Sequence, residues 1–320
     1  MIAKSSMTFK LTFVFAFIVA LGAVAFGQTR TIAITIDDLP VVSTRTDLSN
    51  RQAITKKLLK HIRKARVPVV GFVNESKLYA NGERSEAQVD LLRMWLDAGI
   101  ELGNHTYSHV SLHSVPVEEY KANIIKGETI TKELLAEKGL KLRFFRHPYL
   151  MTGLTLDVKA DIAKFLSGRS YTVAPITFDN ADYIFSRAYD NAFDSGDKAL
   201  MKRVAAAYVP YMESKLDYWE RQSMRLFGRE VSQTMLIHAN FINSDYLDDL
   251  IKMLHRRGYK IVDLETALKD EAYNLPDTYT GRAGISWIHR WAMAKGRDSV
   301  LPNEPEVPEF VMKASGFDSE

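Results

Sequence analysis

Residues 31–40 read TIAITIDDLP, an apolar and largely β-branched run that ends in two adjacent carboxylates and a proline. A short run of this kind is typical of a strand that is buried on both faces. Neighbouring strand residues point to opposite faces, so the chain must turn here if Asp37 and Asp38 are to serve one site. The sequence Leu39-Pro40 is consistent with such a turn. The alternative is that one of the two carboxylates caps the helix that follows.

Similar runs recur along the chain and alternate with longer stretches in which apolar residues have helical spacing. Seven strands are predicted, over Thr31–Ile36, Pro68–Val73, Ile100–Asn104, Lys141–Arg146, Ser170–Phe178, Gln233–Ala239 and Tyr259–Val262. Helices are predicted over Asp47–Ala65, Ser85–Ala98, Val117–Lys138, Leu154–Leu166 and Ser244–Arg257. Such βα repeats imply parallel strands, in either a barrel or a doubly wound sheet. Polar motifs at the ends of several strands favour the barrel, whose active site lies at the C-terminal rim.

Two regions depart from this alternation. Residues 184–230 are predicted to form two helices separated near Pro210, which pad the outside of the barrel; a lid or a dimer surface is the alternative. From residue 271 onward we expect a docked helix over Gly284–Lys295 and then a frayed, proline-containing end. The predicted organisation is therefore a catalytic domain over residues 28–270 and a C-terminal helical extension and tail over residues 271–320.

The first 25 residues have the features of an export signal. Lys4 and Lys10 precede an uncharged, strongly apolar stretch from residue 11 to residue 27. Ala23 and Ala25 form the small-residue pattern that signal peptidase accepts, so we expect cleavage after Ala25 and a secreted or periplasmic protein. The alternative is an uncleaved membrane anchor, because the stretch is close to the shortest that spans a bilayer.

Composition limits the possible functions. The 320 residues are 46% hydrophobic and 25% charged and include no cysteine. This is typical of a globular protein, and it excludes thiolate-ligated metal sites and thiol nucleophiles. The formal charge of +3 falls to +1 without residues 1–25, because two lysines leave with them. No dense run of basic residues remains, so nucleic acid is not expected as a partner. The oligomeric state stays open.

Two histidines follow the third predicted strand, in the stretch GNHTYSH at residues 103–109. His105 and His109 are four residues apart, a spacing that lets both imidazoles face one point when the backbone between them is helical. With Asp38 they give the donor set of a catalytic zinc site, with positions left for water and substrate. The same set suits cobalt, nickel or iron. His113 is a weaker candidate, on the surface or behind the ligands.

Three further polar motifs stand at or just after predicted strands: RHPY at residues 146–149, DNADY at 179–183 and LIH at 236–238. An arginine at a strand end can hold a nearby carboxylate in its ionised form. Taken alone, each residue also has a structural interpretation. Arg146 fits a surface salt bridge, Asp182 a turn, and His238 a hydrogen-bonded histidine of the core.

Taken in order, these motifs resemble those of the polysaccharide deacetylase family, which is carbohydrate esterase family 4 and carries the NodB homology domain. The motifs are Thr-x-Asp-Asp, His-Thr-x-x-His, Arg-x-Pro-Tyr, Asp-x-x-Asp-Tyr and Leu-x-His, and the resemblance runs from about residue 31 to about residue 264. It implies a distorted seven-stranded (β/α) barrel. It also implies metal-dependent hydrolysis of acetyl groups, N-acetyl in the first place and O-acetyl as the alternative, from a cell-wall or extracellular glycan.

The resemblance implies roles residue by residue. Asp37 matches the family's catalytic base, and Arg146 the residue that steadies that base. The metal ligands of the family, which would hold one divalent ion with zinc as the first choice, are matched by Asp38, His105 and His109. His238 matches the catalytic acid and Asp182 the carboxylate that orients it. Tyr149 matches the position whose backbone N–H helps to hold the oxyanion.

The sequence also departs from the family pattern. Leu39 stands where the family usually has glycine, Tyr183 where tryptophan is common, and Leu150 and Met151 where glycine is often found. These positions lie at the rim, so they bear on the substrate rather than on the metal. His147, inside the third motif, has no role in this scheme.

Three other functions remain open from the sequence. One is an amidohydrolase of the same fold that acts on a small non-sugar amide, because a shared fold does not fix the substrate. Another is a non-haem iron oxygenase with the same two histidines and one aspartate. The third is a non-catalytic carbohydrate-binding protein, which a complete set of base, acid and ligands disfavours.

Overall fold

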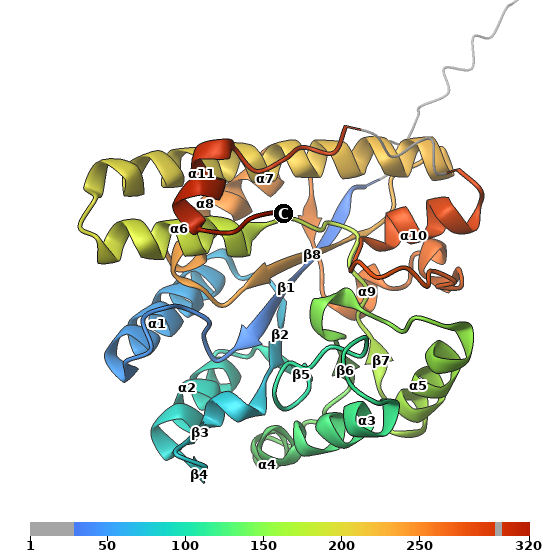
Figure 1. The fold of residues 1–320 in the computed structure, drawn as a ribbon, viewed down its shortest axis with the longest axis horizontal. Coiled ribbons are helices and arrows are strands. Elements are labelled where there is room, and N and C mark those ends of the chain that lie inside the picture. Colours follow the sequence, from blue (N-terminus) through green and yellow to red (C-terminus); the bar gives the residue numbers. More distant parts are fainter. Residues whose placement is uncertain (1–28, 298–302) are drawn as a thin grey trace, which may run out of the picture.

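The computed structural model describes residues 29–297 and 303–320, so the predicted signal at residues 1–25 lies outside the described chain. All seven predicted strands are present, and they form one parallel sheet in the order β7-β6-β5-β2-β1-β8, with β9 paired to β1. These strands are β1 (Thr31–Leu39), β2 (Val69–Val73), β5 (Glu101–Asn104), β6 (Phe144–Phe145), β7 (Thr172–Val173), β8 (Gln233–His238) and β9 (Lys260–Ile261). Helices surround them (Figure 1).

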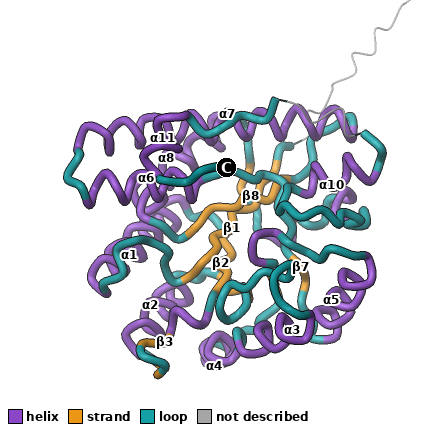
Figure 2. Tube along the Cα trace, in the orientation of Figure 1, coloured by secondary structure: helices purple, strands orange, loops and turns teal. Residues whose placement is uncertain are grey.

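The sheet curls into a distorted barrel. The chain that follows β7 narrows the gap to β8, because the Phe178 N–H donates to the Thr234 carbonyl at 3.0 Å and the Leu236 N–H donates to the Phe178 carbonyl at 3.3 Å. The strands occupy the middle of the molecule and the helices its circumference (Figure 2). The predicted distorted (β/α) barrel is therefore confirmed.

The helices follow the predicted order with shifted ends. They are α1 (Leu48–Ala65), α2 (Glu86–Asp97), α3 (Val117–Lys126), α4 (Thr129–Glu137), α5 (Leu156–Gly168), α6 (Asp182–Asp194), α7 (Lys198–Phe227), α8 (Phe241–Arg256), α9 (Leu264–Ala267), α10 (Trp287–Ala294) and α11 (Glu309–Ser315). A short hairpin, β3 (Tyr79–Ala80) and β4 (Glu83–Arg84), was not predicted. Within the described residues, no helix combines the length and apolar character needed to cross a membrane.

The stretch 117–138, predicted as one helix, is two helices, α3 and α4. They separate at Gly127, where a Cβ would lie 2.5 Å from the backbone nitrogen of Tyr107. That nitrogen donates to the Asn123 carbonyl in α3 at 3.0 Å. The helix is therefore interrupted where the loop with the two predicted histidine ligands packs against it.

The predicted break near Pro210 is wrong. Two helices are present over residues 184–230, but they separate around Gly196, which has φ 72°, and Pro210 lies inside the continuous helix α7. Proline removes the hydrogen bond to the Ala206 carbonyl. Both residues are exposed, so water can solvate that carbonyl, while the opposite face of α7 packs against α6, α8 and α10.

The predicted frayed end is wrong for the part of the tail that the structure describes, whereas the predicted docked helix is present as α10. After residue 302 the chain forms α11, which packs against α6. Val311 is fully buried there, and the Asn191 side chain donates to the Ala314 carbonyl at 2.9 Å. At the last residue, the Glu320 carboxylate accepts a hydrogen bond from the Tyr211 hydroxyl at 3.0 Å. The division at residues 270 and 271 stays a prediction.

Candidate active site

Asp37 and Asp38 lie at the end of β1, and a backbone turn brings both carboxylates to one place. Asp37 shares the face of Ala33, which packs with Phe72 of β2 and with β6 inside the barrel. Asp38 would point outward, but its φ of 69° turns the chain. As a result, Nε2 of His105 lies 3.6 Å from Oδ2 of Asp37 and 4.0 Å from Oδ1 of Asp38. The turn predicted at this position is present.

The three predicted metal ligands converge. Asp38, His105 and His109 each offer one ligand atom, and these atoms lie within 4.8 Å of one another. Nε2 of His109 is 3.7 Å from Oδ1 of Asp38. Ligands bonded to tetrahedral zinc at about 2.0–2.2 Å are roughly 3.3–3.6 Å apart, so a small contraction would place all three on one ion.

Two of these side chains each present an unprotonated atom that is free to meet a cation. Nδ1 of His105 donates to the Arg146 carbonyl at 2.8 Å, which leaves Nε2 unprotonated and directed toward Asp38. Oδ1 of Asp38 is buried and accepts no hydrogen bond from the described residues. Such an oxygen is unfavourable unless a cation meets it. The donor set therefore fits a divalent ion.

The charge states also suit metal binding. Burial lowers the pKa of both His105 and His109 to about 4, so at neutral pH both are neutral, the form that binds metal. Burial would raise the pKa of Asp38, but Lys77 and the imidazoles together lower it below its ordinary value. Nζ of Lys77 lies 3.6 Å from Oδ1 of Asp38. Lys77 comes four residues after β2, and no sequence pattern predicted it as a site residue.

Asp37 and Arg146 are buried beside the metal cluster, with side-chain exposures of 3% and 0%. Nη1 of Arg146 lies 3.5 Å from Oδ2 of Asp37, and Nη2 donates to the Thr35 hydroxyl at 2.9 Å. A surface salt bridge is therefore excluded for Arg146. Burial raises the pKa of Asp37, and Arg146 opposes that rise without cancelling it. A carboxylate with a raised pKa is a stronger base.

His238 lies next to Asp37, because the two residues are partners in the pairing of β1 with β8. Its Nδ1 donates to Oδ1 of Asp182 at 2.7 Å, so Nε2 is the ring nitrogen available to a substrate. The side chain is 17% exposed and is not sealed in the core. Burial alone would lower the pKa of His238, but the Asp182 carboxylate raises it to about 9. His238 is therefore protonated at neutral pH.

Asp182 is the centre of a saturated hydrogen-bond network at the start of α6. Its Oδ2 accepts from the His238 backbone N–H at 2.9 Å, from the Asn240 amide at 3.0 Å and from the Asn243 amide at 2.7 Å. This network excludes a simple turn role. Neither asparagine was predicted from the sequence, although they follow His238 by only two and five residues.

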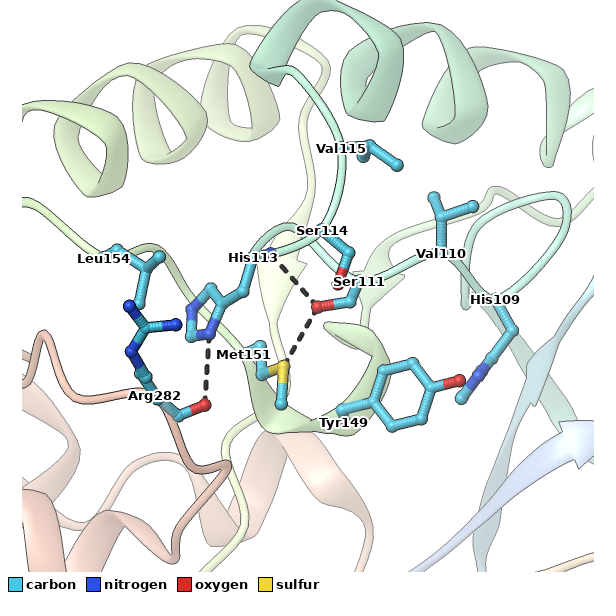
Figure 3. Close-up of a pocket in the computed structure, with 10 residues that line it drawn as sticks. All are labelled: His109, Val110, Ser111, His113, Ser114, Val115, Tyr149, Met151, Leu154 and Arg282. Atoms are coloured by element: carbon cyan, nitrogen blue, oxygen red, sulfur yellow. Dashed lines mark hydrogen bonds between the residues drawn. The ribbon is translucent and has the colours of Figure 1, made fainter.

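Tyr149 stands at the rim, and its ring centroid is 4.5 Å from that of His109. Both residues line one end of a cavity of about 510 Å³, and Leu154 and Arg282 bound its other end (Figure 3). Arg282 comes from the C-terminal extension. The cavity therefore offers space for the part of a ligand that lies next to the metal cluster.

Two other histidines stay outside the cluster. His113 uses both ring nitrogens, since Nδ1 donates to the Arg282 carbonyl at 3.3 Å and Nε2 accepts from the Gly153 N–H at 3.1 Å. His147 is buried, and its Nδ1 accepts from the Tyr120 hydroxyl at 3.0 Å. Burial lowers the pKa of His147 to about 3. The side chains of His113 and His147 therefore form hydrogen bonds within the structure around the site and do not join the metal cluster.

Comparison with known proteins gives a family for part of the chain and a fold for most of it. Residues 27–164 match the family model of the polysaccharide deacetylases. A peptidoglycan-N-acetylglucosamine deacetylase of Bacillus cereus is 33% identical over 118 residues, which is 37% of this chain and 36% of the relative. The chain thus aligns with about a third of the length of that curated relative.

Among solved structures, a mutant of BA3943 from Bacillus anthracis, described as a carbohydrate esterase family 4 pseudoenzyme with restored enzymatic activity, has a TM-score of 0.50. Its sequence identity is 18%, and the match covers 76% of this chain and 68% of that one. At this identity the likeness shows the fold alone. The family model covers the part of the chain that supplies Asp37, the three converging ligands and Arg146. Residues 27–164 are therefore similar in sequence to the polysaccharide deacetylase family.

Proposed function

We propose that the chain is a metal-dependent deacetylase that hydrolyses acetyl groups from a cell-wall or extracellular glycan. N-acetyl groups are the preferred substrate and O-acetyl groups the second choice. One observation carries the proposal: a base, an acid and a metal-binding cluster surround one point at the barrel rim. Asp37 is the strand partner of His238, and its Oδ2 is 3.6 Å from Nε2 of His105.

Asp38, His105 and His109 would hold the ion, with zinc as the first choice and cobalt, nickel or iron as alternatives. When bound, such an ion polarises an acetyl carbonyl and lowers the pKa of water. The neutral imidazoles and the ionised carboxylate are ready to bind it without first losing a proton at neutral pH.

Asp37 accepts the proton of the attacking water in this proposal. Its raised pKa makes it a better base than an exposed carboxylate, and Arg146 holds it in place from 3.5 Å away. The carbonyl oxygen gains negative charge as the water attacks, and the backbone N–H of Tyr149 is assigned to meet that charge.

His238 then protonates the leaving amine through Nε2. This step needs a donor that carries its proton at the working pH. Asp182 keeps His238 protonated in two ways. It accepts a hydrogen bond from the Nδ1–H of His238 at 2.7 Å, and it raises the pKa of His238 to about 9. At the rim, the rings of Tyr149 (54% exposed) and Tyr183 (40% exposed) offer flat surfaces that suit a sugar ring.

Acetate release from a panel of acetylated glycans, with and without a chelator, tests the proposal. We expect release from N-acetylated chitooligosaccharides or peptidoglycan that stops with chelator and returns with added zinc. Release from acetylated xylan alone would favour O-acetyl substrates. Cleavage of small amides only, or activity that depends on oxygen, would instead identify an amidohydrolase or an iron oxygenase.

We also propose export through residues 1–25, with the mature chain secreted or periplasmic. The support is the apolar stretch and the Ala23–Ala25 pattern. Mass spectrometry of the protein recovered outside the cytoplasm should give an N-terminus at residue 26. An intact N-terminus in the membrane fraction would identify an anchor instead.

A further inference from the structure

A buried arginine of the C-terminal extension donates hydrogen bonds to the loop that carries Tyr149. Arg290 in α10 is 1% exposed. Its Nη1 donates to the Thr152 hydroxyl at 2.8 Å and to Oδ2 of Asp277 at 2.7 Å, and its Nη2 donates to the Leu150 carbonyl. Burying a guanidinium is unfavourable unless its donors are used. Here three of the hydrogen bonds that Arg290 donates go to the loop and to the Asp277 carboxylate.

A lysine from α5 joins the same cluster from the other side. Nζ of Lys159 donates to the Thr152 hydroxyl at 2.5 Å, to Oδ2 of Asp277 at 2.6 Å and to the Tyr279 carbonyl at 2.9 Å. Asp277 and Tyr279 belong to the extension, and Thr152 belongs to the loop. The cluster therefore ties the loop after β6 to residues 277–290 of the extension.

The loop needs such support because of its backbone. Tyr149 has φ 57° and Leu150 has φ 53°, so two consecutive residues with side chains are in the left-handed region. This conformation is unfavourable for residues other than glycine and persists only where the surroundings impose it. Arg290 holds the Leu150 carbonyl, which belongs to the peptide that follows this pair of residues.

The extension also touches this peptide directly. Gly284 lies so close that a Cβ built on it would be 1.7 Å from the Tyr149 carbonyl oxygen and 2.9 Å from the Tyr149 carbonyl carbon. Only a residue without a side chain fits against that backbone. Gly284 therefore confines the peptide between Tyr149 and Leu150, and Arg290 holds the next peptide along the chain.

From these contacts we propose that Arg290 and Gly284 are positioning residues for the active site. They hold Tyr149 and Leu150 in the left-handed turn that sets the direction of the Tyr149 N–H. The C-terminal extension then contributes to the geometry of the active site. The inference rests on the proposed function, because it is the tetrahedral oxyanion of that reaction that the Tyr149 N–H would meet.

The test compares Arg290→Ala and Gly284→Ala with two matched controls. Arg229→Ala removes another paired arginine, whose two Nη atoms each donate to Asp270 at 2.7 Å, away from the loop. Gly168→Ala adds a methyl group at a glycine where a Cβ would meet nothing within 4 Å. Gly284→Ala keeps Arg290 in place, so it decides the question if Arg290→Ala does not fold.

We expect both test variants to lose kcat by at least about 10-fold, and by no more than the roughly 100–1,000-fold that loss of an oxyanion donor costs. KM should change by less than about twofold, because the lost interaction is made mainly in the transition state. The zinc content should stay at one ion per chain, and both controls should keep the wild-type kcat. Millimolar methylguanidinium should restore part of the kcat of Arg290→Ala and leave Arg229→Ala unchanged.

Hydrogen exchange gives a readout that does not depend on activity. Backbone N–H groups of residues 149–153 should exchange faster in both test variants and at the wild-type rate in both controls. An unchanged kcat or unchanged exchange in a folded Gly284→Ala protein would overturn the inference, as would a loss of zinc that matches the loss of kcat. If the wild type releases no acetate from any glycan, the proposed function fails, and the exchange rates alone decide whether the extension holds the loop.

Discussion

The proposed site has two sides, which differ in how completely their polar atoms are hydrogen-bonded. The acid side is His238 with Asp182 and its two asparagines, and the metal side is the three proposed ligands with Asp37 and Arg146. On the acid side, the Asp182 carboxylate accepts two hydrogen bonds from His238 and one each from Asn240 and Asn243. On the metal side, the buried polar atoms that have no hydrogen-bond partner among the described residues include Oδ1 of Asp37, Oδ1 of Asp38 and both Nε and Nη1 of Arg146.

The difference shows which half of the site the chain completes by itself. Unbonded buried polar atoms are unfavourable, and a group of them at one point indicates that something else binds there. The acid side needs no such partner. Substitutions on the metal side should therefore remove a bound ion, whereas substitutions on the acid side should change proton transfer and leave the ion in place.

The largest expected effect is on the metal side. Asp38→Ala should abolish stoichiometric zinc binding and lower acetate release by at least about 1,000-fold, because an ion in this role supplies several kcal/mol of transition-state stabilisation. Emission spectroscopy after dialysis measures the zinc. His113→Ala, in the same loop but with both ring nitrogens used elsewhere, should keep its zinc. Full zinc occupancy in Asp38→Ala would refute the assigned ligand set.

On the acid side, His238→Ala should lower kcat by about 100–10,000-fold, the usual range for loss of a general acid. The zinc content should stay at one ion per chain, because His238 bonds Asp182 and not the metal cluster. Steady-state kinetics and zinc analysis on the same sample check both parts. If zinc and activity disappear together, His238 is a ligand or a structural residue, and the contrast between the two sides is lost.

Asp182→Asn should shift the pH dependence with a smaller loss of rate, about 10–100-fold. Asp182 raises the pKa of His238 to about 9, so in the wild type the protonated acid is lost as the pH rises through about 9. The amide cannot supply that negative charge, so the alkaline fall of kcat should move to lower pH. Asp190→Asn, a buried aspartate on the same helix that bonds Ser43, is the matched control. An alkaline limb at the wild-type position in Asp182→Asn would contradict the assignment.

The smallest effect is expected for Asn243→Ala. It removes one of four hydrogen bonds to Asp182 and leaves the buried Tyr208 hydroxyl, which donates to Asn243 at 2.6 Å, without a partner. Urea denaturation should show a loss of about 1–3 kcal/mol in the free energy of unfolding. The kcat should fall by less than about tenfold, because three bonds to Asp182 remain. A loss of kcat as large as that of Asp182→Asn would show that Asn243 has a more direct role.

Much of this architecture could be predicted from the sequence because burial on both faces leaves a local signature. All seven strands were found as short apolar runs, and the turn at Asp38 was required by the alternation of side chains along β1. The convergence of Asp38, His105 and His109 was expected because the carboxyl ends of parallel strands meet at one rim.

What the sequence did not show depends on contacts between distant segments. Pro210 stays helical because its exposed side faces water, which no local propensity indicates. Gly127 interrupts a helix because the backbone of Tyr107 packs on it from twenty residues away. Arg290 lies in a stretch that the sequence predicts only as a docked helix, yet two of its hydrogen-bond partners are 138 and 140 residues away in the chain.

The most direct test of the central claim is to titrate zinc into the apoprotein while acetate release is measured. Asp38, His105 and His109 should bind one ion, so the rate should rise linearly and stop rising at one equivalent of zinc per chain. A rate that is independent of zinc, or that stops rising only at a different ratio, would contradict the claim that one ion at this rim drives the reaction.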